Sequence, residues 1–242
     1  MIKLNEVKLA VALPTYDGRI CIGTALSLMA IQHRVAAVNF MASSGSLLAH
    51  VFNGPLCAAL DLRDKGELTH LLMLHADIIP QTECWLDILW HEYTEIGQKG
   101  MLSVVQPIKD QRGLTSTAVE GAHEWSPRRL TMHEVMEEPI TFTRPDIMLN
   151  TGMLLFDLRE DWVDKAGGFT IRDALGTVAA VDDKPARRMA LVMSEDWGFS
   201  RQARAAGCPQ QYATRAVPCV HVGGMQYPNN RAWGEHKTDQ GG

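Results

Sequence analysis

Two side chains at the end of an apolar run are of types that bind cations and phosphates. The run Leu71–Leu74 leads into His75, Ala76 and Asp77, and Pro80 then stops further strand pairing. Residues two positions apart on an extended chain point to the same side, so His75 and Asp77 can face one ligand together. The alternative is that Asp77 only caps the following turn. The motif alone leaves both interpretations open.

A second imidazole, His221, follows the apolar run Val217–Val220 and comes shortly before Gly223. Glycine allows a ligand or a neighbouring backbone to approach closely. Imidazole nitrogen combined with carboxylate oxygen suits Mn²⁺, and zinc less well. We therefore expect Asp77 and His221, with His75 as a third candidate, to hold a divalent cation, Mn²⁺ or Mg²⁺.

Adjacent carboxylates stand where a helix is predicted to begin. Glu195 and Asp196 follow Ser194, a good N-cap residue, and precede Trp197. Acidic groups in the first turn stabilise a helix by about 0.3–1 kcal/mol each, so simple capping explains them. A carboxylate held there can also act as a general base on an acceptor hydroxyl. We favour the catalytic interpretation because Trp197 and Phe199 would pack beside the pair.

The first predicted strand ends in Pro14, Thr15, Tyr16 and Asp17. The Tyr16 ring can stack on a nucleobase, and Asp17 can accept hydrogen bonds from a base or a ribose. The Gly-x-Gly-x-x-Gly fingerprint of dinucleotide sites is absent after this strand. An ordinary turn between a strand and a helix is the alternative.

Polar residues also interrupt a later apolar run, Ile147–Phe156, at Asn150, Thr151 and Gly152. Such a break lets a sugar ring approach, or marks a β-bulge. Several basic side chains in the irregular stretch Lys109–Pro145 either bind phosphates or lie on the solvated surface. They are Lys109, Arg112, Arg128, Arg129 and Arg144.

The elements that must position these residues alternate regularly at first. Apolar runs predict strands at Val7–Leu13, Val35–Met41, Thr69–His75 and Met101–Gln106. Helical spacing between them predicts helices at Arg19–His33, at Leu47–Leu62 with Pro55 as a kink or a new start, and from Thr82 to Gly97 or Gly100. This order predicts an α/β fold with a mostly parallel, Rossmann-like sheet flanked by helices.

The second half is less regular. Lys109–Pro145 shows no clean period, and a stretch that long is more often functional than idle. Beyond it we expect a short helix around Ile171–Leu175, a helix from Ser194 to Gly207, and strands at Tyr212–Thr214 and Val217–Val220. From Gly223 onward the chain is rich in Gly, Asn and Pro, and we expect this tail to end in a polar, mobile segment.

Composition sets outer bounds. The chain has 242 residues, 46% hydrophobic and 21% charged, with a formal charge of −5. This is typical of a soluble enzyme and argues against a general nucleic-acid binder. Five scattered cysteines without a Cys-x-x-Cys pair favour reduced thiols and a cytoplasmic location. No secretory signal and no run of about 20 apolar residues is present, so we expect no integral membrane segment.

Taken in order, these motifs resemble the GT-A fold nucleotide-sugar-dependent glycosyltransferases, especially the family-2-like group. The resemblance covers most of Val7 to Gly224. It implies a single GT-A domain over residues 1–224, with a nucleotide-binding half at about 1–108 and an acceptor-binding half at about 109–224, followed by the polar tail 225–242. The nucleotide-binding residues that it implies are Pro14, Thr15, Tyr16, Asp17, Asn53, His75, Ala76 and Asp77.

The same resemblance assigns chemical roles. Asp77 matches the last position of the family's Asp-x-Asp motif, and His75 replaces the first Asp. Asn53 matches the Asn of an Arg-Asn pair, with Phe52 in place of the Arg. His221 resembles the family's late metal-binding His. These matches imply a divalent cation and a nucleoside-diphosphate sugar donor.

The acceptor side of the site follows from the same comparison. Asp196, with Glu195 beside it, resembles the base that activates a carbohydrate or other hydroxyl acceptor, which implies inversion. The stretch Asn150–Gly152 resembles a strand of retaining members that lines the sugar site with Trp197 nearby, so the stereochemical outcome stays open.

Three other functions compete with this one. A sugar nucleotidyltransferase would need a Gly-rich phosphate loop after the first strand, which Pro14–Arg19 replaces poorly. A non-catalytic nucleotide- or glycan-binding domain would explain the altered His75. A metal hydrolase using His75, Asp77 and His221 would need more ligands than the sequence places. The donor sugar, the base, the acceptor and the oligomeric state stay undetermined.

Overall fold

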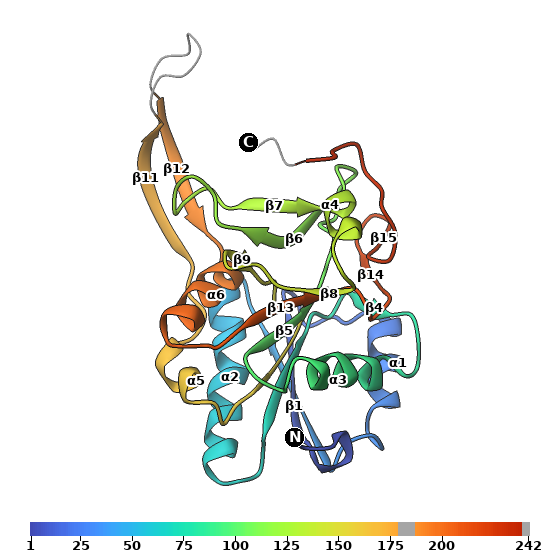
Figure 1. Cartoon of the computed structure of the whole chain (residues 1–242). Coiled ribbons are helices and arrows are strands. Elements are labelled where there is room, and N and C mark those ends of the chain that lie inside the picture. Colours follow the sequence, from blue (N-terminus) through green and yellow to red (C-terminus); the bar gives the residue numbers. More distant parts are fainter. Residues whose placement is uncertain (179–186, 239–242) are drawn as a thin grey trace.

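The computed structural model describes residues 1–178 and 187–238, and a seven-stranded sheet forms its centre (Figure 1). In spatial order the strands are β2 (Ala37–Ser44), β1 (Lys8–Thr15), β3 (His70–Leu74), β10 (Met153–Asp157), β5 (Met101–Val104), β13 (Gln211–Thr214) and β8 (Thr141–Phe142). Strand β10 runs antiparallel to β3 and β5, and β8 runs antiparallel to β13, whereas the other pairs are parallel. The predicted α/β class with a mostly parallel sheet is confirmed.

Helices cover both faces of this sheet. Helices α1 (Ile22–Ala30) and α3 (Trp85–Glu95) pack on one face, and α2 (Leu48–Asp64), α5 (Asp161–Ala166) and α6 (Glu195–Ala205) pack on the other (Figure 1). A short 3₁₀ turn, Leu4–Glu6, precedes β1. Successive residues of β3 alternate between the layers, with Leu72 on the α1–α3 side and Met73 on the α2 side. Central strands buried on both faces explain the continuous apolar runs of the sequence.

Helix α2 continues through Pro55 without starting anew. Proline lacks the N–H that would bond the carbonyl four residues earlier, which belongs to Val51. The Ser43 hydroxyl of β2 donates to that carbonyl instead. A neighbouring strand thus satisfies the group that Pro55 leaves open.

Small sheets and a hairpin lie beyond the carboxyl ends of β1 and β3 (Figure 1). One sheet has the order β7 (Arg128–Thr131), β6 (Leu114–Val119), β9 (Ile147–Met148), with α4 (Met132–Glu137) after β7. The other has the order β15 (Gln226–Pro228), β14 (Cys219–Val222), β4 (Ile78–Pro80). The stretch Lys109–Pro145, predicted to lack a clean period, therefore contains two strands of a separate sheet, a helix and the edge strand β8.

Three predicted elements differ from the structure. The short helix around Ile171–Leu175 is wrong, because these residues enter β11 (Arg172–Val178), which pairs with β12 (Arg187–Met193) in a projecting hairpin. The single run Ile147–Phe156 divides into β9 and β10, which belong to different sheets. The last strand is shifted, so that His221 lies within β14, opposite Ile78, instead of following the strand.

The first part of the predicted polar tail, after Gly224, is packed on the domain. Asn229 is completely buried, and its amide bonds the N–H of Cys219 at 2.9 Å and the carbonyl of Val217 at 3.0 Å. The Trp233 ring packs against Tyr227 at 5.6 Å between centroids. Residues 239–242 of the predicted tail lie outside the described residues. Within residues 1–178 and 187–238, no helix is both long and apolar enough to cross a bilayer.

Candidate functional site

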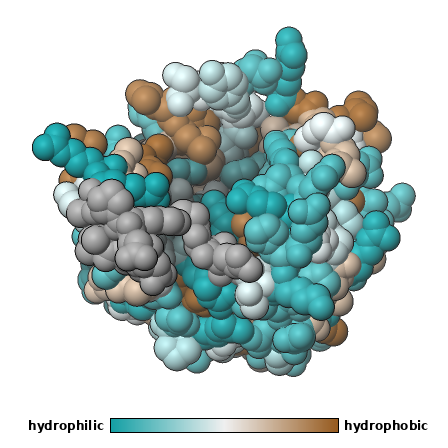
Figure 2. Space-filling view, turned by 90° about the horizontal axis from the view of Figure 1, so that it is seen from above, coloured by the Kyte–Doolittle hydropathy of each residue, from teal (hydrophilic) through white to brown (hydrophobic). Residues whose placement is uncertain are grey.

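A cavity of about 400 Å³ lies where β1 and β3 end. This volume is within the usual range for a small-molecule site. Its lining comprises Pro14, Thr15, Tyr16, Asp17, Arg19, Ile20, Cys21, Leu48, Phe52, His75, Ala76 and Asp77. All the predicted nucleotide-binding residues except Asn53 therefore meet here. Seen from this end of the molecule, the surface is mostly hydrophilic, with apolar groups gathered around a recess (Figure 2).

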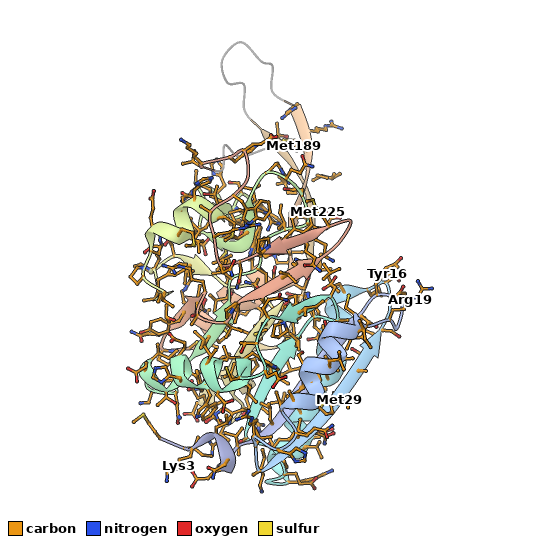
Figure 3. All side chains as sticks on the ribbon, turned by 90° about the vertical axis from the view of Figure 1, so that its right-hand side faces the viewer. Lys3, Tyr16, Arg19, Met29, Met189 and Met225 are labelled. Atoms are coloured by element: carbon orange, nitrogen blue, oxygen red, sulfur yellow. The ribbon has the colours of Figure 1, made fainter. Side chains whose placement is uncertain are left out.

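The loop after β1 is fixed at its base and open at its tip. The Thr15 hydroxyl accepts from the Gly18 N–H at 3.0 Å and donates to the Ser43 carbonyl at 3.2 Å. Asp17 accepts from the Arg19 N–H at 3.1 Å. The Tyr16 side chain is 76% exposed and points outward with Arg19 (Figure 3). This aromatic ring is available for stacking on a planar ligand.

His75 forms the floor of the cavity. Its ring stacks on Phe52 at 5.4 Å between centroids, and its Nε2 hydrogen-bonds the Thr151 hydroxyl at 3.1 Å. Burial lowers the pKa of His75 to about 4, although the nearby Asp77 carboxylate opposes the shift. His75 is therefore neutral at physiological pH, and its Nε2 is already engaged with Thr151.

Asp77 lies between two nitrogen groups. The Lys109 ammonium donates to its Oδ2, and the His221 Nε2 lies 3.4 Å from its Oδ1. Burial alone would raise the pKa of Asp77, but the hydrogen bonds from His221 and Lys109 outweigh it and hold that pKa far below its usual range. About a third of the side-chain surface of both Asp77 and Lys109 is exposed, so a ligand can reach them.

His221 has the orientation of a metal-binding imidazole. Its Nδ1 lies 2.7 Å from the Pro107 carbonyl, which only accepts, so Nδ1 carries the proton. Its Nε2 faces Asp77, where it hydrogen-bonds the carboxylate when protonated and offers a lone pair to a cation when deprotonated. Such backbone anchoring of the other nitrogen is usual for metal-binding histidines. Among residues 1–178 and 187–238, no three His, Cys, Asp or Glu side chains form a metal site by themselves. Asp77 and His221 fit a cation that takes its other ligands from phosphate and water.

The predicted sugar-binding strand has a supporting role in this structure. The Asn150 amide donates to the Val104 carbonyl at 3.1 Å and to the Thr117 hydroxyl at 3.2 Å, and its oxygen accepts from the Gly152 N–H at 3.0 Å. A Cβ on Gly152 would lie 2.7 Å from the Ile78 side chain. Thr151 is the member of this stretch that connects to the cavity lining, through His75. This stretch therefore positions the floor of the cavity.

The acidic pair begins α6, as predicted. Asp196 accepts from the Ser194 hydroxyl and from the Trp197 N–H at 2.8 Å. Burial raises the pKa of Asp196, although these hydrogen bonds and Arg129 oppose the shift. Glu195 is 8% exposed, and burial together with the charge of Asp196 raises its pKa to about 7. A carboxyl with a pKa near neutrality is suited to accept a proton.

Strand β6 lies on a series of hydrogen bonds between the start of α6 and His221. The Trp197 indole donates to the Ser116 carbonyl at 2.8 Å, and the Ser116 N–H donates to the Gln106 carbonyl at 2.8 Å. Gln106 precedes Pro107, which anchors His221. Hydrogen bonds of side chains and backbone thus link Trp197, next to the acidic pair, to His221, whereas Glu195 and Asp196 are not among the residues that line the cavity. The Arg129 guanidinium lies 4.5 Å from the centre of the Trp197 ring.

Asn53 does not line the cavity. Its amide nitrogen donates to the Phe169 carbonyl at 2.7 Å, and its oxygen accepts from the Phe169 N–H at 2.7 Å. These two bonds join α2 to the loop after α5. Its neighbour Phe52 lines the cavity instead.

Neither Lys109 nor the apolar residues that line the cavity carry a distinguishing signal in the sequence. Lys109 is one of five basic residues that the sequence offers for phosphate binding, and nothing in its local pattern distinguishes it. The pattern places Ile20, Leu48 and Phe52 only in helices. Their place in the lining of a strand-end cavity depends on how α1 and α2 pack, which periodicity does not report.

Comparison with known proteins supports the fold. No family model and no curated protein sequence matches the chain. The crystal structure of A197 from STIV matches with a TM-score of 0.54 and 13% identity, covering 94% of this chain and 94% of that one. Mannose-1-phosphate geranyltransferase from Thermus thermophilus gives a TM-score of 0.41 at 10% identity, covering 86% and 73% of the two chains.

A mutant of UDP-glucose pyrophosphorylase from Leishmania major gives a TM-score of 0.41 at 11% identity, covering 89% of this chain and 64% of that one. The likeness to A197 extends over nearly the whole of both chains. This chain therefore has the α/β fold of A197, with a candidate ligand site at the carboxyl ends of β1 and β3.

Proposed function

We propose that this protein transfers a sugar from a nucleoside-diphosphate sugar to an acceptor hydroxyl. The single observation that carries the proposal is the cavity that an exposed aromatic ring, Tyr16, and the carboxylate of Asp77 both line. The ring offers a stacking surface for a base, and the groups around Asp77 offer positive charge for a diphosphate. The nucleotide-binding half would span about 1–108, and the acceptor-binding half about 109–224.

Departure of the diphosphate requires neutralisation of its growing negative charge. Lys109 and His221 flank Asp77, and the Lys109 ammonium can donate hydrogen bonds to phosphate oxygens. A divalent cation, Mn²⁺ or Mg²⁺, held by Asp77 and His221 would supply Lewis-acid stabilisation there. His75 would help by keeping the cavity floor in place through Thr151 rather than as a ligand.

The acceptor hydroxyl must lose its proton as it attacks the anomeric carbon. Asp196 is the proposed base, because Ser194 and the Trp197 N–H fix its orientation. Burial raises its pKa and makes it a better proton acceptor than an exposed carboxylate. Glu195 adds negative charge beside it. A direct displacement with this base inverts the anomeric configuration.

The test begins with ligand identity. Thermal-shift measurements with nucleoside diphosphates and their sugars, each with Mn²⁺ and with excess chelator, should show selective stabilisation by one nucleotide. The selected nucleotide sugar should then be hydrolysed or transferred slowly. Pyrophosphate-dependent formation of a nucleoside triphosphate would instead show a sugar nucleotidyltransferase, and binding without turnover would show a non-catalytic domain.

Asp196→Asn tests the base. This variant should lose sugar transfer by about 100-fold or more, the usual contribution of a general base, while donor affinity stays unchanged. Glu195→Gln is the matched control on the neighbouring carboxyl and should retain more transfer. Full activity of Asp196→Asn would assign the base to another group.

A further inference from the structure

The Lys109 side chain packs in a defined position beside Asp77. Its methylenes pack against Gly223, where an added Cβ would come within 3.0 Å of Cδ and 3.2 Å of Cβ of Lys109. The backbone next to it is fixed, because the Ile108 N–H donates to the Leu114 carbonyl at 2.9 Å. The other wall is fixed too, because the Val222 N–H donates to the Asp77 carbonyl at 2.8 Å. These contacts place the Lys109 side chain beside the Asp77 carboxylate.

The contact between Lys109 and Asp77 opposes the binding of a cation and favours the binding of an anion. Asp77 has two carboxylate oxygens, and Lys109 bonds one while His221 faces the other. An added cation must then share Asp77 with a positive group already present, which opposes its binding. A diphosphate, in contrast, meets an ammonium that is about a third exposed and has three N–H donors.

We propose that Lys109 is a diphosphate-binding residue that occupies Asp77 in the ligand-free protein, in competition with a divalent cation, and transfers its hydrogen bond to the diphosphate when the donor binds. The proposal rests on the proposed function in taking a diphosphate as the ligand. It adds that the Lys109 ammonium gives the site affinity for diphosphate even when a chelator has removed divalent cations.

Lys109→Met removes the charge and keeps most of the packing against Gly223. Without nucleotide, the variant should bind Mn²⁺ about tenfold more tightly than the natural protein, measured from the electron paramagnetic resonance signal of free Mn²⁺. In excess chelator, it should bind inorganic pyrophosphate about tenfold more weakly by calorimetry, since a charge-assisted hydrogen bond is lost.

Controls separate this competition from a general defect. Lys65→Met removes an exposed lysine at the end of α2 and should change neither affinity. Lys109→Arg keeps the charge and should retain most of the pyrophosphate affinity. Thermal unfolding of each variant checks the fold.

The proposal requires both shifts. Unchanged Mn²⁺ affinity or unchanged pyrophosphate affinity in Lys109→Met would overturn it. If both shifts appear but no nucleotide sugar is turned over, the role of Lys109 stands and glycosyl transfer fails. Turnover without either shift would leave glycosyl transfer standing and remove Lys109 from the diphosphate site.

Discussion

At the scale of single residues, the two adjacent carboxyls Glu195 and Asp196 oppose the stability of the helix that they begin. Helix N-termini favour negative charge, but here burial disfavours it. The pKa of Glu195 is raised to about 7 from its ordinary 4.5 by burial and by the charge of Asp196. Between these values the folded protein binds more protons than the unfolded chain, so this carboxyl destabilises the fold increasingly as the pH rises toward 7.

Glu195→Gln should therefore be more stable than the natural protein at pH 8 by about 2–3 kcal/mol, and nearly equal to it at about pH 4.5. Urea unfolding at the two pH values measures the difference. Equal stability at both pH values would mean that the carboxyl ionises as it does in an exposed position. If Glu195→Gln is more stable but transfers less sugar, the Glu195 carboxylate is needed for activity although it destabilises the fold.

At the scale of elements, α2 depends on contacts that its own sequence does not supply. Ser43 satisfies the carbonyl left open by Pro55, and Asn53 joins the helix to Phe169 by two hydrogen bonds of 2.7 Å. The second contact matters for the site, because Phe52 packs its ring on both His75 and Phe169. Asn53 thus acts on the cavity wall through its neighbour.

Asn53→Ala should lower the free energy of unfolding by about 2 kcal/mol, since the N–H and carbonyl of Phe169 lose their partner. Asp61→Ala, on the exposed face of the same helix, should change it little. Thermal and urea unfolding measure both variants. If Asn53→Ala instead kept its stability and lost nucleotide binding, the direct nucleotide contact implied by the family resemblance would be correct.

At the scale of the whole molecule, acid sensitivity has a source within the core. His70 is completely buried against Trp90 and Tyr93, and its Nε2 has no hydrogen-bond partner among the described residues. Burial lowers its pKa to about 4, although Asp157 opposes the shift. In the unfolded chain His70 binds a proton near pH 6.5, whereas in the folded protein it binds one only near pH 4. The free energy of unfolding therefore falls as the pH drops from about 6.5 to about 4.

Between about pH 6.5 and 4, the free energy of unfolding of His70→Phe should fall by about 3 kcal/mol less than that of the natural protein. Urea unfolding across that range compares the slopes of stability against pH for the variant and the natural protein. Identical slopes would show that His70 is protonated in the fold, paired with Asp157.

Local pattern predicted much of this molecule. The apolar runs of β1, β2, β3 and β5 and the alternating helices determine an α/β sheet, because central strands and amphipathic helices have different periods. The residues that follow β1 and β3 are then expected at one edge, since carboxyl ends of parallel strands meet there. The cavity contains those residues, from Pro14 to Asp17 and from His75 to Asp77.

Tertiary structure alone decided the rest. Strand β10 enters antiparallel between β3 and β5, and Arg172–Leu175 form a strand because β11 pairs with β12, which follows later in the chain. Such pairings depend on residues far along the chain, which local periodicity does not encode. The same holds for Lys109, whose contact with Asp77 requires β5, β3 and β14 to converge. The sequence by itself determined which side chains end the strands, and long-range packing decided which charges they meet.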